Sequence, residues 1–482
     1  MPGPTYIGNI GVYIPPLRLT RASIAAATSW LNPGATATAR GARAICNWDE
    51  DAVTMAVEAG RGLRGAMTPG RLLLASTTLP FVDRSQAALV AAALDLDAQL
   101  QTQDAGGTLR AGTSALLQAA QSNVDQDAWV IATDARVAQP GSGDEMRFGH
   151  AAVALQLSSQ SSARNSPIAT LLGAASLSEN FVDHYRGSEA EFNYTLEERW
   201  VRDSAQLPMP PRAIAAALKS AGVDAATVQH IAMPGATALV RKIAERCGMK
   251  HAVVVDNLHA DCGDSGVAHP LLLLASVLER ANPGEHIAVI GFGQGVDALI
   301  FRVESGVMAL RAKAPIATAL AKRREESQYL RYLSHAGLVN MDFGMRAERD
   351  QRTAHSVAWR KHRMLDAFVG GQCKACNTVQ FPLSRVCANP DCRLTDQQQP
   401  FALAESKGHL KTFTEDWQAY SPRPPYVYGN VAFEPGGNLL MELTDVAPGE
   451  LTIGDALRFV FRVKDIDRAR GFRRYFWKAV RA

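Results

Sequence analysis

Short apolar runs alternate with Ala/Leu-rich helical stretches through the first 310 or so residues of this 482-residue chain. Runs such as RLLLAS, AWVIAT and HAVVVD lack a strict alternation of apolar and polar residues, which is typical of strands covered by helices on both faces. Strands alternating with helices predict an α/β fold with a buried sheet. The two halves of this stretch, 1–160 and 161–310, each end in glycine-associated strand-like segments, which indicates a duplicated unit.

The pattern changes twice after residue 310. Residues 311–365 are dense in charge and helix formers, so they predict a helical linker. From residue 366 onward Gly, Pro, aromatic and β-branched residues predominate, which favours a small all-β region. A chain of this length exceeds what one hydrophobic core organises, and we expect two or three domains.

Composition limits the partners and the location. Hydrophobic residues make up 47% and charged residues 20%, the formal net charge is +3, and no dense basic run interleaves with aromatics. This balance predicts no nucleic-acid partner. The N-terminus lacks the basic and apolar regions of a signal peptide, and no apolar run is long enough to span a bilayer. We therefore expect a cytoplasmic protein with no membrane association.

Four of the seven cysteines lie within twenty residues, in the segment CKACNTVQFPLSRVCANPDC. Two close pairs of thiolates can complete a tetrahedral site, and zinc suits four soft sulfur ligands. A site with no open coordination position is structural. The sequence therefore predicts structural Zn²⁺; the alternative is a ribbon that has lost its metal. The expected ligands are Cys373, Cys376, Cys387 and Cys392.

The segment around these cysteines resembles DUF35 proteins over residues 355–482. That resemblance implies a helical hook, a rubredoxin-like zinc ribbon at 366–395 and an OB-fold at 396–482. DUF35 proteins accompany thiolase-like enzymes, and they are thought to handle acyl-CoA or to hold partners together.

Residues 5–305 resemble hydroxymethylglutaryl-CoA (HMG-CoA) synthases, through YIGNIGVYIPPLRL, WDEDAVTMAVEAGRGL and GFGQGVDALIFRV. The resemblance implies a thiolase-like, five-layered αβαβα domain over 1–310, built from two similar halves. It also implies a homodimer whose sheets continue across the interface, and a coenzyme A thioester as substrate.

The chemistry of that family rests on a cysteine, a histidine and a glutamate. Matching the family's motifs to this sequence places Leu109, Ala232 and Thr77 at the three positions. No cysteine lies between residues 47 and 246, so we expect no acyl transfer through a cysteine at the usual helix N-terminus.

Candidate acid and base residues come from NLHADCGDSGVAHP, which resembles the family's asparagine-bearing loop. His259 and His269 are candidates because histidine exchanges protons near neutral pH. Asp264 either orients a histidine or bonds backbone amides in a turn, and His269 alternatively caps or packs a helix. Tyr185, in a segment that corresponds to one lining the acyl pocket, is a candidate proton donor or a surface tyrosine.

The glycine-rich segment GFGQG is expected to hold the substrate. Backbone amides at Gly293 and Gly295 are expected near the thioester oxygen. Cys262 is the thiol nearest a family active-site segment, and the alternative is a small buried apolar residue.

Three functions follow from these features. The first is a cysteine-independent lyase that cleaves a β-hydroxyacyl-CoA by a retro-aldol reaction into a shorter acyl-CoA and an aldehyde or ketone. Cysteine-free thiolase-like aldolases of steroid side chains, which work with a DUF35 partner, are similar. The second is an HMG-CoA synthase-like condensing enzyme or acyltransferase. The third is a non-catalytic scaffold that binds a partner thiolase. The sequence does not identify the acyl group.

Overall fold

The computed structural model describes residues 5–65, 68–121, 127–159, 166–346 and 354–482. The chain divides into two compact units. Unit 1 comprises Met1–Cys46, Asp51–Ala88 and Asp97–Tyr329. Unit 2 comprises Asn47–Glu50, Leu89–Leu96 and Leu330–Ala482. The boundary expected between two halves at residue 160 lies outside the described residues.

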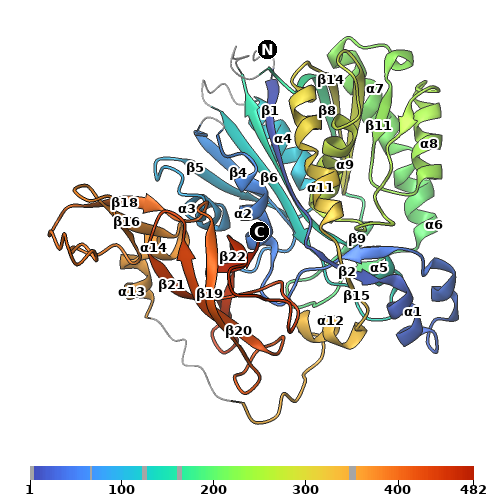
Figure 1. Cartoon of the computed structure of the whole chain (residues 1–482). Helices are drawn as coiled ribbons and strands as arrows, with labels where there is room; N and C mark the ends of the chain where they lie inside the picture. The colour runs from blue at the N-terminus through green and yellow to red at the C-terminus, as the bar shows by residue number, and fades with distance from the viewer. Residues whose placement is uncertain (1–4, 66–67, 122–126, 160–165, 347–353) are drawn as a thin grey trace. The chain divides into compact units, whose positions relative to one another are not determined.

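Unit 1 contains a mixed ten-stranded sheet of order β12-β11-β13-β14-β8-β1-β7-β6-β4-β5 (Figure 1). The order is duplicated: outward from the β1–β8 pair, each side has two antiparallel neighbours and then parallel outer strands. The strand order and pairing are therefore the same on the two sides of the β1–β8 pair. The strands are β1 (Thr5–Tyr13), β4 (Arg71–Ala75), β5 (Gln101–Ala105), β6 (Ala128–Ala135), β7 (His150–Ser158), β8 (Ala169–Ser178), β11 (His230–Ala232), β12 (Val253–Val254), β13 (His286–Phe292) and β14 (Gly295–Val303).

Helices cover both faces of each half of the sheet. On β13, Ile287 and Val289 pack in one core cluster with the central helices α4 (Ala111–Gln121) and α9 (His269–Leu278). The intervening residues of the same strand pack in a second cluster with the outer helices α7 (Met209–Ala221) and α8 (Thr237–Arg246). In the other half, α2 (Ala52–Arg61) contacts β1, β6 and β7. Because side chains alternate along a strand, apolar runs without polar alternation are required here.

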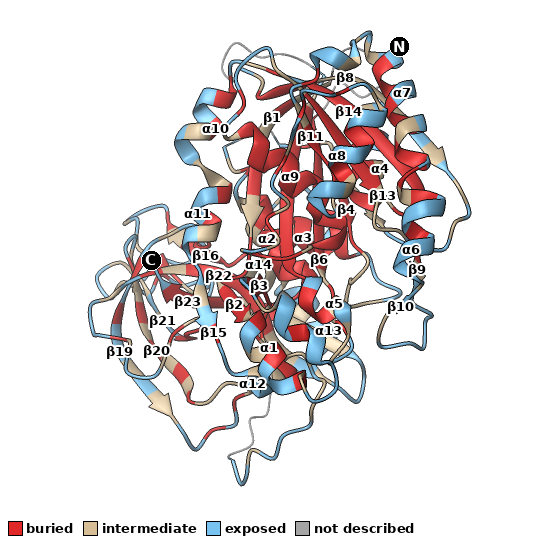
Figure 2. Cartoon of the chain, turned by 90° about the vertical axis from the view of Figure 1, so that its right-hand side faces the viewer, coloured by how far each residue is buried: buried red, intermediate tan, exposed pale blue. Residues whose placement is uncertain are grey.

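The central helix α9 shows how the sequence sets this arrangement. All ten of its residues are buried, and Pro270 occupies its first turn, where a missing N–H costs no helical hydrogen bond. A helix that is apolar on every side must be surrounded by protein. Figure 2 shows the buried residues concentrated in these central helices and the strands beside them.

The stretch from 311 to 365 is less uniformly helical than the sequence predicts. It contains α11 (Pro315–Ala321), α12 (Tyr329–His335), α13 (His355–Arg360) and α14 (His362–Asp366). It also contains a strand, β15 (Arg324–Glu326), which pairs in parallel with β2 (Leu17–Thr20) beside β3 (Ala42–Ala44). This strand is charged and forms because the edge of β2 offers it backbone partners, so local composition gave no sign of it.

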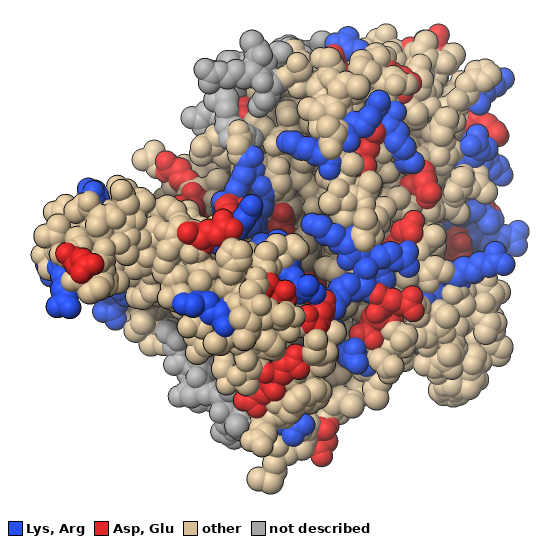
Figure 3. Space-filling model, in the orientation of Figure 1, with Lys and Arg blue, Asp and Glu red and all other residues tan. Residues whose placement is uncertain are grey.

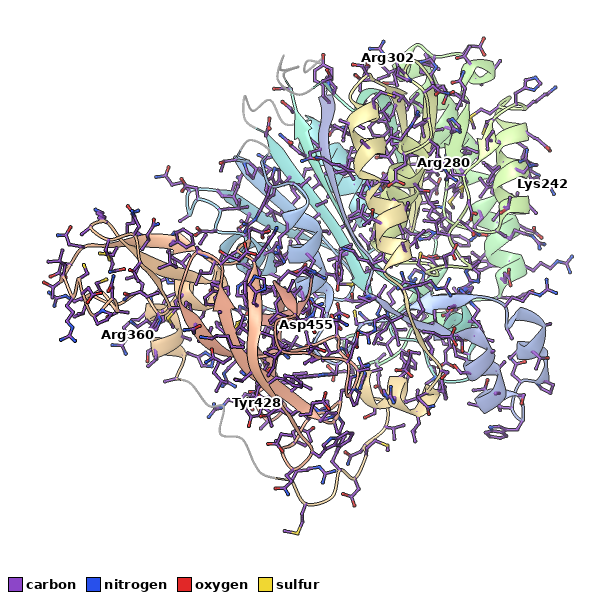
Figure 4. The ribbon with its side chains drawn as sticks, viewed as in Figure 1. Lys242, Arg280, Arg302, Arg360, Tyr428 and Asp455 are labelled. Carbon is purple, nitrogen blue, oxygen red and sulfur yellow. The ribbon has the colours of Figure 1, made fainter. Side chains whose placement is uncertain are left out.

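Unit 2 contains a small ribbon and a five-stranded antiparallel sheet. The ribbon consists of β16 (Val369–Cys373), β17 (Val379–Gln380) and β18 (Gln398–Ala402). The buried ring of Phe368 lies within about 6 Å, centroid to centroid, of five other aromatic rings, which organise an aromatic core. On the sheet, the ring centroids of Tyr426 and Tyr428 lie 5.3 Å apart. Figure 4 labels Tyr428. The sheet strands are β19 (Gly408–Asp416), β20 (Tyr426–Phe433), β21 (Asn438–Glu442), β22 (Ala456–Asp467) and β23 (Phe472–Arg481).

Two surface properties bear on the expected partners. Within the part of the chain that the structure describes, no helix combines the length and apolar character needed to cross a membrane. On the face seen in Figure 3, basic and acidic side chains are interspersed.

Candidate functional site

The turn between β13 and β14 lies against the start of helix α4. The Gly293 carbonyl oxygen accepts hydrogen bonds from Thr108 Oγ1 at 2.7 Å and from Arg110 Nε at 3.1 Å. A Cβ atom on Gly293 would lie 3.0 Å from the Leu109 nitrogen, so a side chain there would collide with the helix start. Glycine is therefore required by close backbone approach.

One of the two expected amide donors, that of Gly293, has an acceptor within the turn. The Gly293 N–H donates to the Gly295 carbonyl at 3.0 Å and is therefore used inside the turn. The Leu109 N–H has no hydrogen-bond acceptor among the described residues. Sequence reasoning treated Leu109 only as the place of a missing nucleophile. Its position just before a helix, where the first amides have no intrahelical partner, was the available signal.

The loop before α9 brings three of the four candidate catalytic residues together. Asp264 and His269 both act electrostatically on His259. Asp264 Oδ1 accepts a hydrogen bond from the Gly266 N–H at 2.8 Å, as in the turn considered from sequence. Burial raises the pKa of the Asp264 carboxyl, but His269 and Arg136 lower it by more, so the pKa lies below its usual value. Asp264 is therefore ionised at neutral pH.

His259 is the candidate base with a free ring. Its side chain is half-buried, and the ring has no hydrogen-bond partner among the described residues. Burial and then Arg21 lower the pKa of His259 to about 4, against the opposing effect of Asp264. The imidazole is therefore neutral at pH 7 and able to accept a proton.

His269 has a structural environment. It is buried at the first position of α9, and its Nδ1 accepts from the Ser265 N–H at 3.2 Å. Burial lowers the pKa of His269, although Asp264 opposes the shift. These contacts favour the packing alternative over proton transfer.

Tyr185 lies on an exposed hairpin, β9 (His184–Tyr185) and β10 (Tyr194–Thr195). Its side chain is 55% exposed, and its ring lies 5.5 Å from that of Tyr194. The hairpin is tied to the site at two points, because Arg186 donates to the Thr77 carbonyl and Gln294 donates to Asp183. Tyr185 is thus on a hairpin bonded to Thr77 and Gln294, but no hydrogen bond joins its side chain to the other candidates among the described residues.

The three positions that the sequence predicts to correspond to the family's catalytic residues hold weakly reactive side chains. Thr77 Oγ1 donates to the buried carboxylate of Asp134 at 3.0 Å, and Asp134 also accepts from the Val267 N–H at 2.9 Å. Ala232 is fully buried, and Leu109 packs against the core. That these residues replace catalytic ones stays a prediction.

Cys262 is buried, and burial raises the pKa of its thiol to about 12. Its Sγ contacts the Leu258 carbonyl at 3.4 Å. A thiol of this kind is protonated at neutral pH, which favours the apolar-residue alternative over a displaced nucleophile.

The four clustered cysteines in unit 2 converge. Their sulfur atoms all lie within 4.8 Å of one another, with Cys373–Cys392 at 3.9 Å and Cys376–Cys387 at 3.5 Å. Tetrahedral zinc with Zn–S bonds of about 2.3 Å needs sulfurs about 3.8 Å apart. Donor type and spacing both fit zinc.

Comparisons with known proteins match the two parts of the chain separately. A family described as "ChsH2, C-terminal OB-fold domain" matches residues 402–462. An HMG-CoA synthase of Caldivirga maquilingensis is 26% identical over 343 residues, covering 63% of this chain and 88% of that protein. A DUF35 domain-containing scaffold protein of Methanocaldococcus jannaschii is 29% identical over 117 residues, covering 24% of this chain and 79% of that protein. The chain joins an HMG-CoA synthase-like thiolase-fold region to a DUF35 region.

Solved structures agree on the fold of the thiolase-fold region. MvaS in complex with 3-hydroxy-3-methylglutaryl coenzyme A aligns with a TM-score of 0.60 at 18% identity, over 70% of this chain and 93% of that one. A 3-oxoacyl-(acyl carrier protein) synthase III from Pseudomonas aeruginosa aligns with a TM-score of 0.53 at 19% identity, over 62% of this chain and 98% of that one. The expected thiolase-like fold, followed by a cysteine cluster and an OB-fold, is confirmed.

Proposed function

We propose that the thiolase-fold region is a lyase that cleaves a β-hydroxyacyl-CoA by a retro-aldol reaction, without a covalent acyl-enzyme. The observation that carries the proposal is the contrast between two side chains of one loop. Cys262 is buried and protonated, whereas His259 is neutral, half-buried and free of hydrogen bonds to the described residues. The loop therefore offers a base, His259, but no reactive thiol nucleophile at Cys262.

The reaction needs a base and a hydrogen-bond donor that stabilises the negative charge of the enolate. His259 takes the proton of the β-hydroxyl group, and the Cα–Cβ bond breaks to release an aldehyde or ketone. The bonding electrons pass to the thioester as an enolate, whose oxygen accepts from the Leu109 N–H. The protonated His259 then returns its proton to the α-carbon, which completes a shorter acyl-CoA. Asp264, which is ionised, favours the transient imidazolium.

The substrate class rests on the relatives. HMG-CoA synthases, one of them described as complexed with CoA, share the fold of this region. We therefore propose a CoA thioester as substrate and, by the same likeness, a homodimer. The alternative, a condensing enzyme or acyltransferase, requires either a displaced nucleophile such as Cys262 or acyl delivery from a partner, and the buried Cys262 gives the first route little support.

For the DUF35 region we propose a structural Zn²⁺ held by the four clustered cysteines. When bound, zinc would cross-link the two cysteine pairs of a ribbon that has little hydrophobic core of its own. A scaffold role is a second candidate, because two relatives of this region are described as DUF35 domain-containing scaffold proteins. A scaffold should co-purify with a second thiolase. The expected cytoplasmic location stays a prediction.

The test is turnover by the purified, zinc-loaded protein. A panel of β-hydroxyacyl-CoA thioesters is incubated with it, and both products are followed by mass spectrometry. Cleavage is expected to survive Cys262→Ser and to be lost in His259→Ala. Covalent labelling by radiolabelled acetyl-CoA that disappears in Cys262→Ser would instead establish the acyltransferase. Absence of turnover on every thioester, together with a co-purifying thiolase, would establish the scaffold.

A further inference from the structure

A buried carboxylate is hydrogen-bonded to the start of α4, next to the Leu109 amide in sequence. Asp297, on β14, is completely buried and accepts hydrogen bonds from three hydroxyl groups and one guanidinium. The hydroxyl donors are Thr113 at 2.9 Å, Ser114 at 2.6 Å and Ser176 at 2.7 Å. Arg110 Nη1 completes the set at 2.8 Å. A buried carboxylate needs this many hydrogen-bond donors to offset the cost of removing it from water.

Arg110 connects this carboxylate to the turn above it. While Nη1 pairs with Asp297, Nε donates to the Gly293 carbonyl at 3.1 Å and Nη2 donates to Ser178 Oγ at 3.1 Å. All three nitrogens of the guanidinium therefore donate hydrogen bonds, and Nη1 also lies 3.5 Å from Ser114 Oγ. Two of these partners, Asp297 and Gly293, belong to the β13–β14 hairpin, whereas Arg110 itself belongs to the helix start that presents the Leu109 amide.

We propose that Arg110, anchored by Asp297, is the positioning residue that holds the Gly293 turn against the Leu109 amide and so fixes the place of the thioester oxygen. This inference rests on the proposed function, because it assigns a role within the same site. Arg110 acts through the backbone and does not touch the reacting atoms.

The geometry of the guanidinium explains why arginine suits this position. Its planar fork holds donors at fixed angles, so one side chain fixes the carboxylate and the carbonyl relative to each other. A lysine ammonium also neutralises Asp297, but a single nitrogen on a flexible stem does not fix two acceptors in one geometry. A shift of about 1 Å in a catalytic group can cost about 100-fold in rate.

Arg110→Lys separates positioning from charge pairing. We expect kcat to fall about tenfold or more, KM to rise no more than severalfold, and the midpoint of thermal unfolding to stay close to that of the wild type. Thr108→Val removes the other hydrogen bond to the Gly293 carbonyl without changing charge, and it is expected to lower kcat in the same way. Ser178→Ala is the matched control, because it removes an Arg110 contact that does not involve the turn, and it should behave as wild type.

Binding provides a readout that does not depend on turnover. Acetyl-CoA and S-ethyl-CoA differ only by the carbonyl oxygen, and titration calorimetry should show that the wild type prefers acetyl-CoA severalfold. Arg110→Lys is expected to abolish this preference and to retain affinity for S-ethyl-CoA. If the wild type turns over no substrate, the proposed lyase fails while this comparison still decides on Arg110. Equal affinity of the wild type for the two ligands, or an Arg110→Lys variant that keeps both preference and kcat, would overturn the inference.

Discussion

Replacing Lys478 by methionine is expected to destabilise unit 2 strongly. The Lys478 ammonium lies 2.9 Å from Asp49 Oδ2 and 3.2 Å from Glu442 Oε2. The side chains are 2% exposed for Lys478, 0% for Asp49 and 6% for Glu442. The ammonium also lies 4.1 Å from the centre of the Trp48 ring. Methionine keeps the apolar stem but leaves two buried carboxylates without this counter-charge.

The magnitude follows from what each carboxylate retains. Glu442 keeps Lys464 at 2.6 Å and the Tyr426 hydroxyl at 2.6 Å. Asp49 Oδ1 lies 4.0 Å from Arg462 Nε, too far for a hydrogen bond. Breaking a buried pair by removing one partner costs about 3–5 kcal/mol, because an uncompensated charge stays buried. Most of this cost should fall on Asp49.

Lys464→Met is the matched control, since Lys464 pairs with the same Glu442 but is 33% exposed. A partly exposed pair contributes about 1 kcal/mol or less. Differential scanning calorimetry of the zinc-loaded full chain should resolve the transition of unit 2. A loss of 1 kcal/mol lowers the unfolding midpoint of a unit of this size by about 2–4 °C. Lys478→Met should therefore lower the unfolding midpoint of unit 2 by about 6–20 °C, and Lys464→Met should lower it by a few degrees at most. Equal shifts in the two variants would refute the reasoning.

Three further outcomes are expected. Chelation of zinc, or Cys387→Ser, should unfold the ribbon and lower the unfolding midpoint of unit 2, detected by calorimetry with metal analysis; an unchanged midpoint would count against a structural metal. Lyase activity should fall as pH drops through about 4, because burial and Arg21 lower the pKa of His259 to about 4 and only its neutral form accepts a proton. Since the unfolded histidine titrates near 6.5, the same shift predicts that stability declines as pH falls from about 6.5 to 4, and His259→Gln should remove this part of the decline. Gly149→Ala should destabilise unit 1 by several kcal/mol in chemical denaturation, because its Cβ would lie 1.9 Å from the Cys262 carbonyl oxygen. A denaturation midpoint equal to that of the wild type would show that the loop shifts to accommodate the added methyl group.

Local sequence signals predicted the parts of the molecule that depend on neighbouring residues. The spacing of Cys373, Cys376, Cys387 and Cys392 was sufficient to predict a convergent cluster, because short loops bring these thiols together. The alternation of apolar runs with helical stretches predicted the sheet and its covering helices for the same reason. His259, Asp264 and His269 belong to one short loop, so their proximity in space could be predicted from the sequence.

Local sequence signals could not predict which residues distant in the sequence lie side by side. Arg110 and Asp297 are separated by 187 positions, and their pairing depends on which residue of β14 faces the start of α4. The candidate role of the Leu109 amide likewise depends on the Gly293 N–H donating within its own turn, which no local sequence pattern indicates. The strand at Arg324–Glu326 likewise exists because of an open edge on β2 and not because of its own composition.

In the proposed lyase, the two halves of the fold would divide the chemistry between them. The two central helices, α4 and α9, come from different halves of the sheet, and their starts approach each other so closely that a Cβ on Gly112 would lie 2.5 Å from the Val267 carbonyl oxygen. One half thereby supplies the Leu109 amide, which has no acceptor in the described part of the chain, and the other supplies the loop with His259 and Asp264. Charge stabilisation and proton transfer thus reside on separate elements, and neither depends on the side chain at position 109. Loss of a nucleophile from one half would abolish acyl transfer while leaving both functions that a retro-aldol cleavage requires.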